Sequence, residues 1–166
     1  MSPALTFFLW FLFSYLHSTS ESKGLKILQK IKSKSGKRME FEQAWQQIQE
    51  IVSSTPVVHT LSRRVPNRII YSDENVIIVE SERPAKSETP QERKLKKEKF
   101  RQFWKVLTQQ GQMVQEDVRE YHGVGRIIMA FLARLPYVEY SLQPQTLYLM
   151  LTATHEIGTI RERRTS

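Results

Sequence analysis

The chain has 166 residues, an ordinary apolar fraction of 40%, a formal net charge of +8 and no cysteine. This length suits one domain or two small lobes that share a core, and the lack of cysteine excludes disulfides, thiolate zinc sites and a cysteine nucleophile. Residues 1–38 hold seven Lys/Arg and one acidic residue, whereas residues 39–166 hold eighteen against sixteen, so the excess of positive charge belongs mainly to the N-terminal segment.

The N-terminal segment, residues 1–38, joins an apolar run to a basic one. Residues 3–16 are almost all apolar, but they are fewer than the roughly 20 residues of a membrane-spanning helix. Three interpretations stay open: a disordered or non-native extension upstream of a start at Met39, a membrane-associated segment, or a cleaved secretory signal. We expect a cytoplasmic protein, with membrane association through residues 3–16 as the alternative.

Residues 39–90 are expected to form a helix followed by a small antiparallel sheet. Apolar residues recur at helical spacing over residues 40–52. Three short β-type runs follow, at residues 56–61, 67–71 and 75–81. Asp73-Glu-Asn75 has the composition of a hairpin turn between the last two runs. Residues 81–90 are polar and contain two prolines, which indicates a linker or an exposed loop.

Residues 91–153 are expected to form a second lobe, in the order helix, short strand, helix, helix and hairpin. The helical pattern begins at Gln91, and FRQFWKVLTQQG places apolar residues at i, i+3, i+4 and i+7 before Gly111. VQEDVREY predicts a second, short helix. GVGRIIMAFLARLP predicts a third, with one apolar stripe that excludes Met129, Ala133 and Arg134. VEYSLQPQTLYL predicts the hairpin, and residues 154–166 a flexible tail. The expected fold class is therefore α+β.

This order of elements resembles a winged helix-turn-helix domain over about residues 92–151. The three helices of such a domain correspond to FRQFWKVLTQQG, VQEDVREY and GVGRIIMAFLARLP, and the wing corresponds to VEYSLQPQTLYL. The resemblance implies a DNA-binding module in which the third helix enters the major groove and the wing contacts the backbone.

No catalytic or metal-binding constellation is recognisable in the sequence. The histidines lie far apart and lack the paired spacing of a metal site, so no cofactor or metal is expected. Gly123-Val-Gly125 lacks the third glycine of a dinucleotide-binding motif and the Gly-Lys-Ser/Thr of a P-loop. We interpret it as a turn that starts a helix. The protein is not expected to be an enzyme.

Clustered cations make nucleic acid the expected partner, because Lys and Arg contact backbone phosphates. The candidate contacts are Arg63, Arg64, Arg68, Arg93, Lys94, Lys97, Arg101, Arg126 and Arg134. The outer face of the third helix adds only Met129, Ala130 and Ala133 to its arginines, which predicts DNA binding of low sequence specificity. The alternative is a protein–protein interaction or adaptor module that docks through that face and the wing. The N-terminal segment would allow such a module to be tethered to a membrane.

Overall fold

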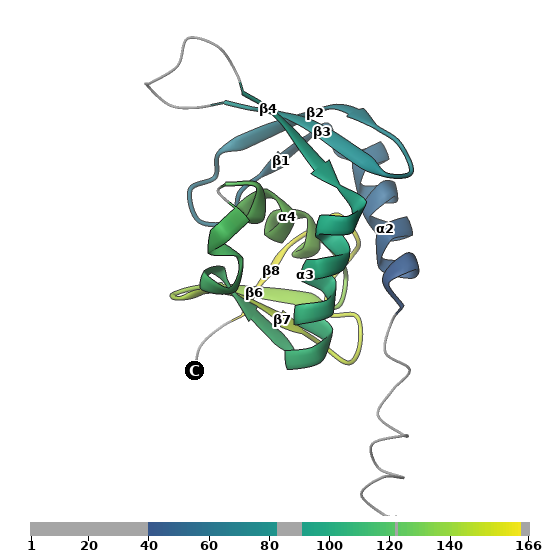
Figure 1. Cartoon of the computed structure of the whole chain (residues 1–166). Helices are drawn as coiled ribbons and strands as arrows, with labels where there is room; N and C mark the ends of the chain where they lie inside the picture. Colours follow the sequence, from purple (N-terminus) through teal and green to yellow (C-terminus); the bar gives the residue numbers. More distant parts are fainter. Residues whose placement is uncertain (1–39, 83–90, 122, 164–166) are drawn as a thin grey trace, which may run out of the picture. The chain divides into compact units, whose positions relative to one another are not determined.

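The computed structural model describes residues 40–82, 91–121 and 123–163. The chain divides into two units, residues 1–38 and 39–166, and all interpretations of residues 1–38 lie outside the described residues, as does most of the predicted linker. The described part of the second unit combines helices with two four-stranded sheets, which confirms the α+β fold class (Figure 1). No helix in the described ranges has the length and apolar character needed to cross a membrane.

The first sheet is an antiparallel meander that follows one amphipathic helix. Helix α2 (Phe41–Ser54) precedes four strands in the order β1-β2-β3-β4. Their bounds are Val57–His59, Pro66–Ser72, Val76–Ser81 and Gln91–Lys96. The turn between β2 and β3 is the predicted one, because the Asp73 carboxylate accepts hydrogen bonds from the backbone N–H groups of Asn75 and Val76, at 2.7 and 2.8 Å.

The second half of the chain has the expected order of elements. Helix α3 (Lys97–Gln110) ends at Gly111, whose φ of 75° is the left-handed conformation predicted there. Strand β5 (Gln112–Val114), the 3-10 helix η1 (Gln115–Tyr121), helix α4 (Val124–Leu132) and the hairpin of β6 (Val138–Leu142) and β7 (Gln145–Leu149) follow. The second sheet has the strand order β5-β7-β6-β8, where β8 is Arg161–Glu162.

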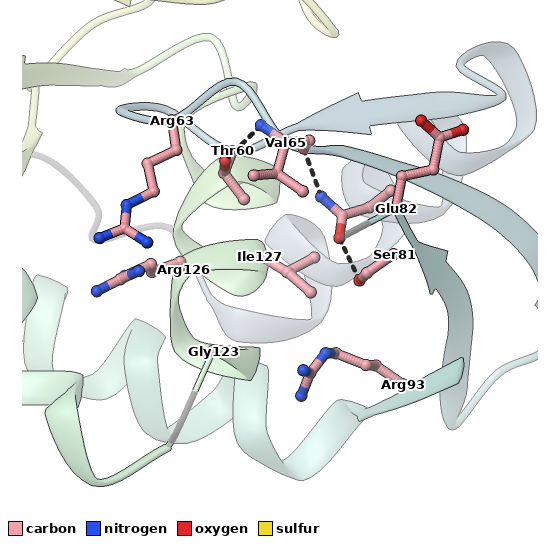
Figure 2. Close-up of a pocket in the computed structure, with 10 residues that line it drawn as sticks. Thr60, Arg63, Val65, Ser81, Glu82, Arg93, Gly123, Arg126 and Ile127 are labelled. Atoms are coloured by element: carbon pink, nitrogen blue, oxygen red, sulfur yellow. Dashed lines mark hydrogen bonds between the residues drawn. The ribbon is translucent and has the colours of Figure 1, made fainter. Parts of the chain in front are cut away.

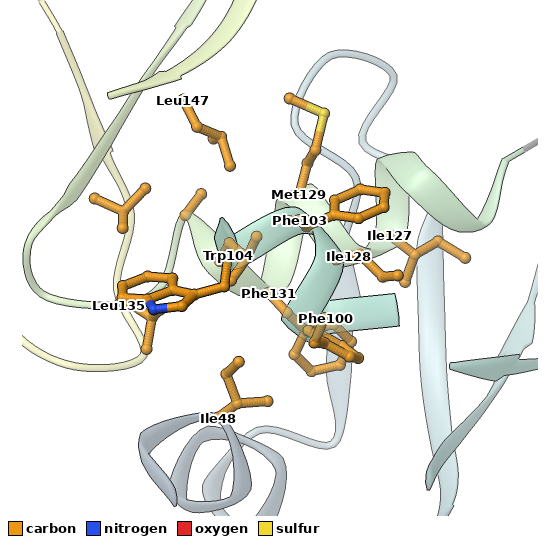
Figure 3. Packing of buried hydrophobic residues seen from close by; sticks show 14 of the residues in the cluster. Ile48, Phe100, Phe103, Trp104, Ile127, Ile128, Met129, Phe131, Leu135 and Leu147 are labelled. Carbon is orange, nitrogen blue, oxygen red and sulfur yellow. The ribbon is translucent and has the colours of Figure 1, made fainter. Parts of the chain in front are cut away.

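One hydrophobic core joins the two sheets to helices α2, α3 and α4. Trp45 of α2, Phe100 of α3 and Phe131 of α4 stack edge to face in succession, with ring centroids 5.1 and 5.9 Å apart. Figure 3 shows α4 residues at the centre of this cluster, with Ile48 of α2 on one side and Leu147 of β7 on another. The predicted lobes 39–90 and 91–153 therefore share a core.

Residues 91–96 form strand β4, although the sequence pattern predicts the start of a helix there. β4 pairs along its whole length with β3, and only Leu95 is fully buried. A strand with one buried apolar residue does not show the alternation of apolar and polar residues that predicts a strand. Its Lys and Glu residues are typical of edge strands, because charged side chains prevent pairing with another chain. Helix α3 therefore starts at Lys97 and not at Gln91, where the sequence pattern predicts it.

Helix α4 is buried on both sides, which corrects the expectation of a single apolar stripe. Figure 1 shows α4 between the two sheets. Met129, Ala130 and Ala133 have no exposed surface, and the Gln145 amide of β7 approaches the Met129 sulfur at 3.7 Å. A helix that is apolar all round is buried on all sides. The face proposed for partner docking is therefore absent from the surface of the described unit.

The segment after β7 is bonded to the second sheet, although the sequence predicts a flexible tail from residue 154. β8 pairs in parallel with β6, and the Arg163 N–H donates to the Tyr140 carbonyl at 2.7 Å. Arg161 forms an ion pair with the Glu139 carboxylate at 3.3 Å. A two-residue polar strand has no periodicity that the sequence could reveal. Residues 164–166 lie outside the described part.

Candidate functional site

Three of the predicted cationic contacts are paired with acidic side chains on the surface. Arg68 lies 2.8 Å from the Glu80 carboxylate across strands β2 and β3. Lys97 and Arg101 share Glu42 of α2, at 2.7 and 2.9 Å. Both bonds lower the pKa of the Glu42 carboxyl, the bond from Lys97 most. These cations offer little uncompensated charge to a ligand.

Arg134 is buried, and it does not face the solvent as a nucleic-acid contact would. Its side chain lies on the core side of the turn after α4 with 7% of the residue exposed, and Nη1 donates to the Ala130 carbonyl at 2.6 Å. Burial, with a smaller contribution from the charge of Arg64, lowers its pKa to about 10. Arg64 itself is exposed, with a left-handed φ of 53°, and Lys94 is exposed on β4.

The other three predicted arginines converge on one cavity. Arg63, Arg93 and Arg126 line a pocket of about 440 Å³ (Figure 2), which we call the arginine pocket. Its other lining residues are Thr60, Val65, Asn67, Ser81, Glu82, Gly123 and Ile127. Residues that are 63 positions apart in the sequence are thus brought to one place by the packing of α4 against the first sheet.

Each pocket arginine comes from a different element. Arg63 lies in the turn between β1 and β2, which the Thr60 hydroxyl closes by accepting the Val65 N–H at 3.0 Å. Arg93 projects from β4 opposite Val79, whose side chain is buried, so it extends from the inner face of the sheet. Arg126 occupies the first turn of α4. Three separately anchored backbones therefore fix the positions from which the three side chains extend.

The wall of the pocket under the Arg63 turn is held by a buried polar network. The Asn67 amide donates to the carbonyls of Val58 and Val65 at 3.0 and 2.9 Å. Its side-chain oxygen accepts a hydrogen bond from the Ser81 hydroxyl at 2.6 Å. Asn67 is 1% exposed, and its bonds tie β1, the Arg63 turn and β3 together. The sequence pattern shows Asn67 only as the start of a β-type run.

The start of α4 adds backbone donors beside Arg93. Gly123 precedes the helix with a φ of 84°, and no side chain caps the first N–H groups. A Cβ at Gly123 would lie 3.7 Å from Nη1 of Arg93, which places the guanidinium directly over this glycine. The first turn of a helix carries unsatisfied N–H groups and partial positive charge. Its position at the pocket favours an anionic ligand there.

The pocket keeps its positive charge because its arginines are not paired. Within the described ranges, Arg63, Arg93 and Arg126 form no ion pair, and Arg93 donates only to the neutral Gln91 side chain, at 2.8 Å. Among the described residues, Glu82 is the one acidic side chain in the lining, and Figure 2 shows its carboxylate pointing away from the guanidinium groups. The described lining residues have a net formal charge of +2, from three arginines and one glutamate.

No family model, curated protein or solved structure matches this chain. The chemistry of the arginine pocket must therefore be judged from its own residues. In the described ranges, no group of three or more His, Asp or Glu side chains is placed to hold a metal ion. The order α3, β5, η1, α4 and hairpin is the order on which the winged-helix resemblance rests, but α4 presents no open outer face for a DNA groove.

Proposed function

We propose that this chain is a non-enzymatic nucleic-acid-binding protein that contacts the backbone of duplex DNA with low sequence specificity. The observation that carries the proposal is the arginine pocket. Arg63, Arg93 and Arg126 line one cavity without forming an ion pair among the described residues. Guanidinium groups match phosphate oxygens in geometry and charge, so a phosphate is the ligand that this lining fits best.

Low sequence specificity follows from the burial of α4. Base readout requires polar side chains on an element that enters a groove. Seven of the nine residues of α4 are buried, and Arg126 is its one cation. Arg126 lines the pocket, and Figure 2 shows it extending to the same side of α4 as Arg63. Contact with the phosphate backbone is therefore the main source of affinity, and it carries no base information.

The test is a titration of the full-length protein with a labelled duplex at several salt concentrations. Replacing all three pocket arginines with Ala should weaken binding and reduce the slope of log affinity against log salt by about 0.9 for each phosphate that the variant no longer neutralises. The matched control is Arg119→Ala, since Arg119 is an exposed arginine outside the pocket, bonded to Glu116. The basic segment 1–38 is present in every variant, so its contribution cancels in the comparison.

Equal binding by all variants would contradict the proposal. If the triple variant and Arg119→Ala bind the duplex with the same affinity and the same salt slope as the unaltered chain, the pocket does not contact the backbone. Binding would then come from residues 1–38 or from scattered surface cations such as Lys94, and not from the arginine pocket.

A further inference from the structure

The arginine pocket is larger than a backbone phosphate alone requires. Its volume of about 440 Å³ lies in the range of roughly 300–1,000 Å³ that is typical of small-molecule sites. Its lining combines the three guanidinium groups with polar side chains and with the apolar side chains of Val65 and Ile127. A site of this composition fits a ligand with one anionic group and one less polar group.

The charge of the lining also exceeds what one backbone phosphate offsets. A phosphodiester carries a single negative charge, whereas a phosphomonoester carries about −1.5 to −2 at neutral pH and offers three strong acceptor oxygens. Arg63, Arg93 and Arg126 approach from the β1–β2 turn, from β4 and from α4, that is, from three directions. Figure 2 shows the side chains of Arg63 and Arg126 extending to the same side of α4, and that of Arg93 on the other side. The combined charge of Arg63 and Arg126 matches that of a monoester. The N–H groups at the start of α4 add to this preference.

We propose that the arginine pocket binds a nucleotide phosphomonoester, with its phosphate on Arg63 and Arg126 and its nucleoside against Val65 and Ile127. In nucleic acid this group is the terminal phosphate of a strand, and a free mononucleotide supplies the same chemistry. The inference rests on the proposed function, because it assumes that nucleic acid binds and names the phosphorylated strand end as the preferred binding site. It adds a ligand class and a selectivity that backbone contact does not imply.

The experiment compares short duplexes of one sequence whose ends carry a 5′-phosphate, a 3′-phosphate or hydroxyls only, titrated with the full-length protein. One phosphorylated end should bind about tenfold more tightly than the hydroxyl end, which corresponds to about 1.4 kcal/mol. Arg126→Ala and, separately, Arg63→Ala should remove this difference, and Arg119→Ala should retain it. Arg63 is exposed in a turn, so its replacement tests the site without disturbing the core.

Competition identifies the source of the phosphomonoester. Adenosine monophosphate should displace the phosphorylated duplex at lower concentration than inorganic phosphate does, because the nucleoside adds contacts with the apolar lining. Equal competition by the two would overturn the assignment of a nucleotide. Equal affinity for phosphorylated and hydroxyl ends, with salt-dependent binding of both, would overturn the inference and leave the proposed function standing. Binding of adenosine monophosphate that depends on Arg126, without binding of any duplex, would support the phosphomonoester site and overturn the proposed function.

Discussion

Replacement of Asn67 by Ala tests the polar network that shapes the arginine pocket. The side chain makes three hydrogen bonds, to the Val58 and Val65 carbonyls and with the Ser81 hydroxyl, at 2.6 to 3.0 Å. A buried hydrogen bond contributes about 1 kcal/mol net. Removal of three should lower the free energy of unfolding by about 3 kcal/mol. Because one of these bonds restrains the Arg63 turn, affinity for the duplex should fall as well.

Urea denaturation followed by tryptophan fluorescence measures this loss. The midpoint should move to lower urea while the slope m stays unchanged, since the surface exposed on unfolding is the same. Ser81→Ala removes only the 2.6 Å bond to Asn67, and the double variant should cost less than the two single changes together, with a coupling of about 1 kcal/mol. A loss below about 1 kcal/mol for Asn67→Ala, or strictly additive effects, would refute the reasoning that this network holds the pocket wall.

Three further predictions follow from the burial and pairing of other side chains. Arg134→Met should leave both the urea midpoint and the duplex affinity unchanged or slightly higher, because an apolar chain replaces a buried cation that has no acidic partner among the described residues. Glu42→Gln should increase duplex affinity at low salt, measured by the same titration, because it releases Lys97 and Arg101 from their shared carboxylate. The pKa of His155 is lowered below 6.5 by burial, so the unfolded chain takes up the proton first as pH falls. The contribution of His155 to stability should therefore be fully present above about pH 6.5 and be lost as the pH falls below it. Urea midpoints measured from pH 7.5 to 5.5 should show this loss, and His155→Gln should remove it.

The sequence was a reliable guide wherever a local rule determined the structure. Helix α2 and the second half of α3 follow the helical spacing of apolar residues. Asp73 determines the β2–β3 turn through its own side chain, and Gly111 ends α3 because a glycine takes a positive φ without steric cost. The element order from α3 to β7 follows from the same kind of local signal.

The prediction failed where a distant partner decides the structure. Gln91–Lys96 becomes a strand because β3 offers an unpaired edge, which no spacing within those six residues reveals. Met129, Ala133 and Arg134 were placed outside the apolar stripe of the third helix, and they are buried because two sheets cover α4 from opposite sides. Seven of the nine candidate cations are predicted from local clusters, and Arg126 and Arg134 from their place on the third helix. Neither pattern shows which cation has an acid within reach.

The glycines of Gly123-Val-Gly125 show how a local motif and a distant site depend on each other. Gly123 adopts a φ of 84°, which other residues take only with strain. A Cβ at Gly125 would lie 3.0 Å from the Val118 carbonyl oxygen, so a larger residue would push α4 away from η1. Both glycines are therefore required to start α4 at the place where Arg126 reaches the cavity. The motif is not a known phosphate-binding loop, yet its conformation aims a helix N-terminus and a guanidinium at the same pocket as Arg63 and Arg93. Most of helix α4 is apolar and buried. It contributes to the candidate site through its first turn, which carries Arg126.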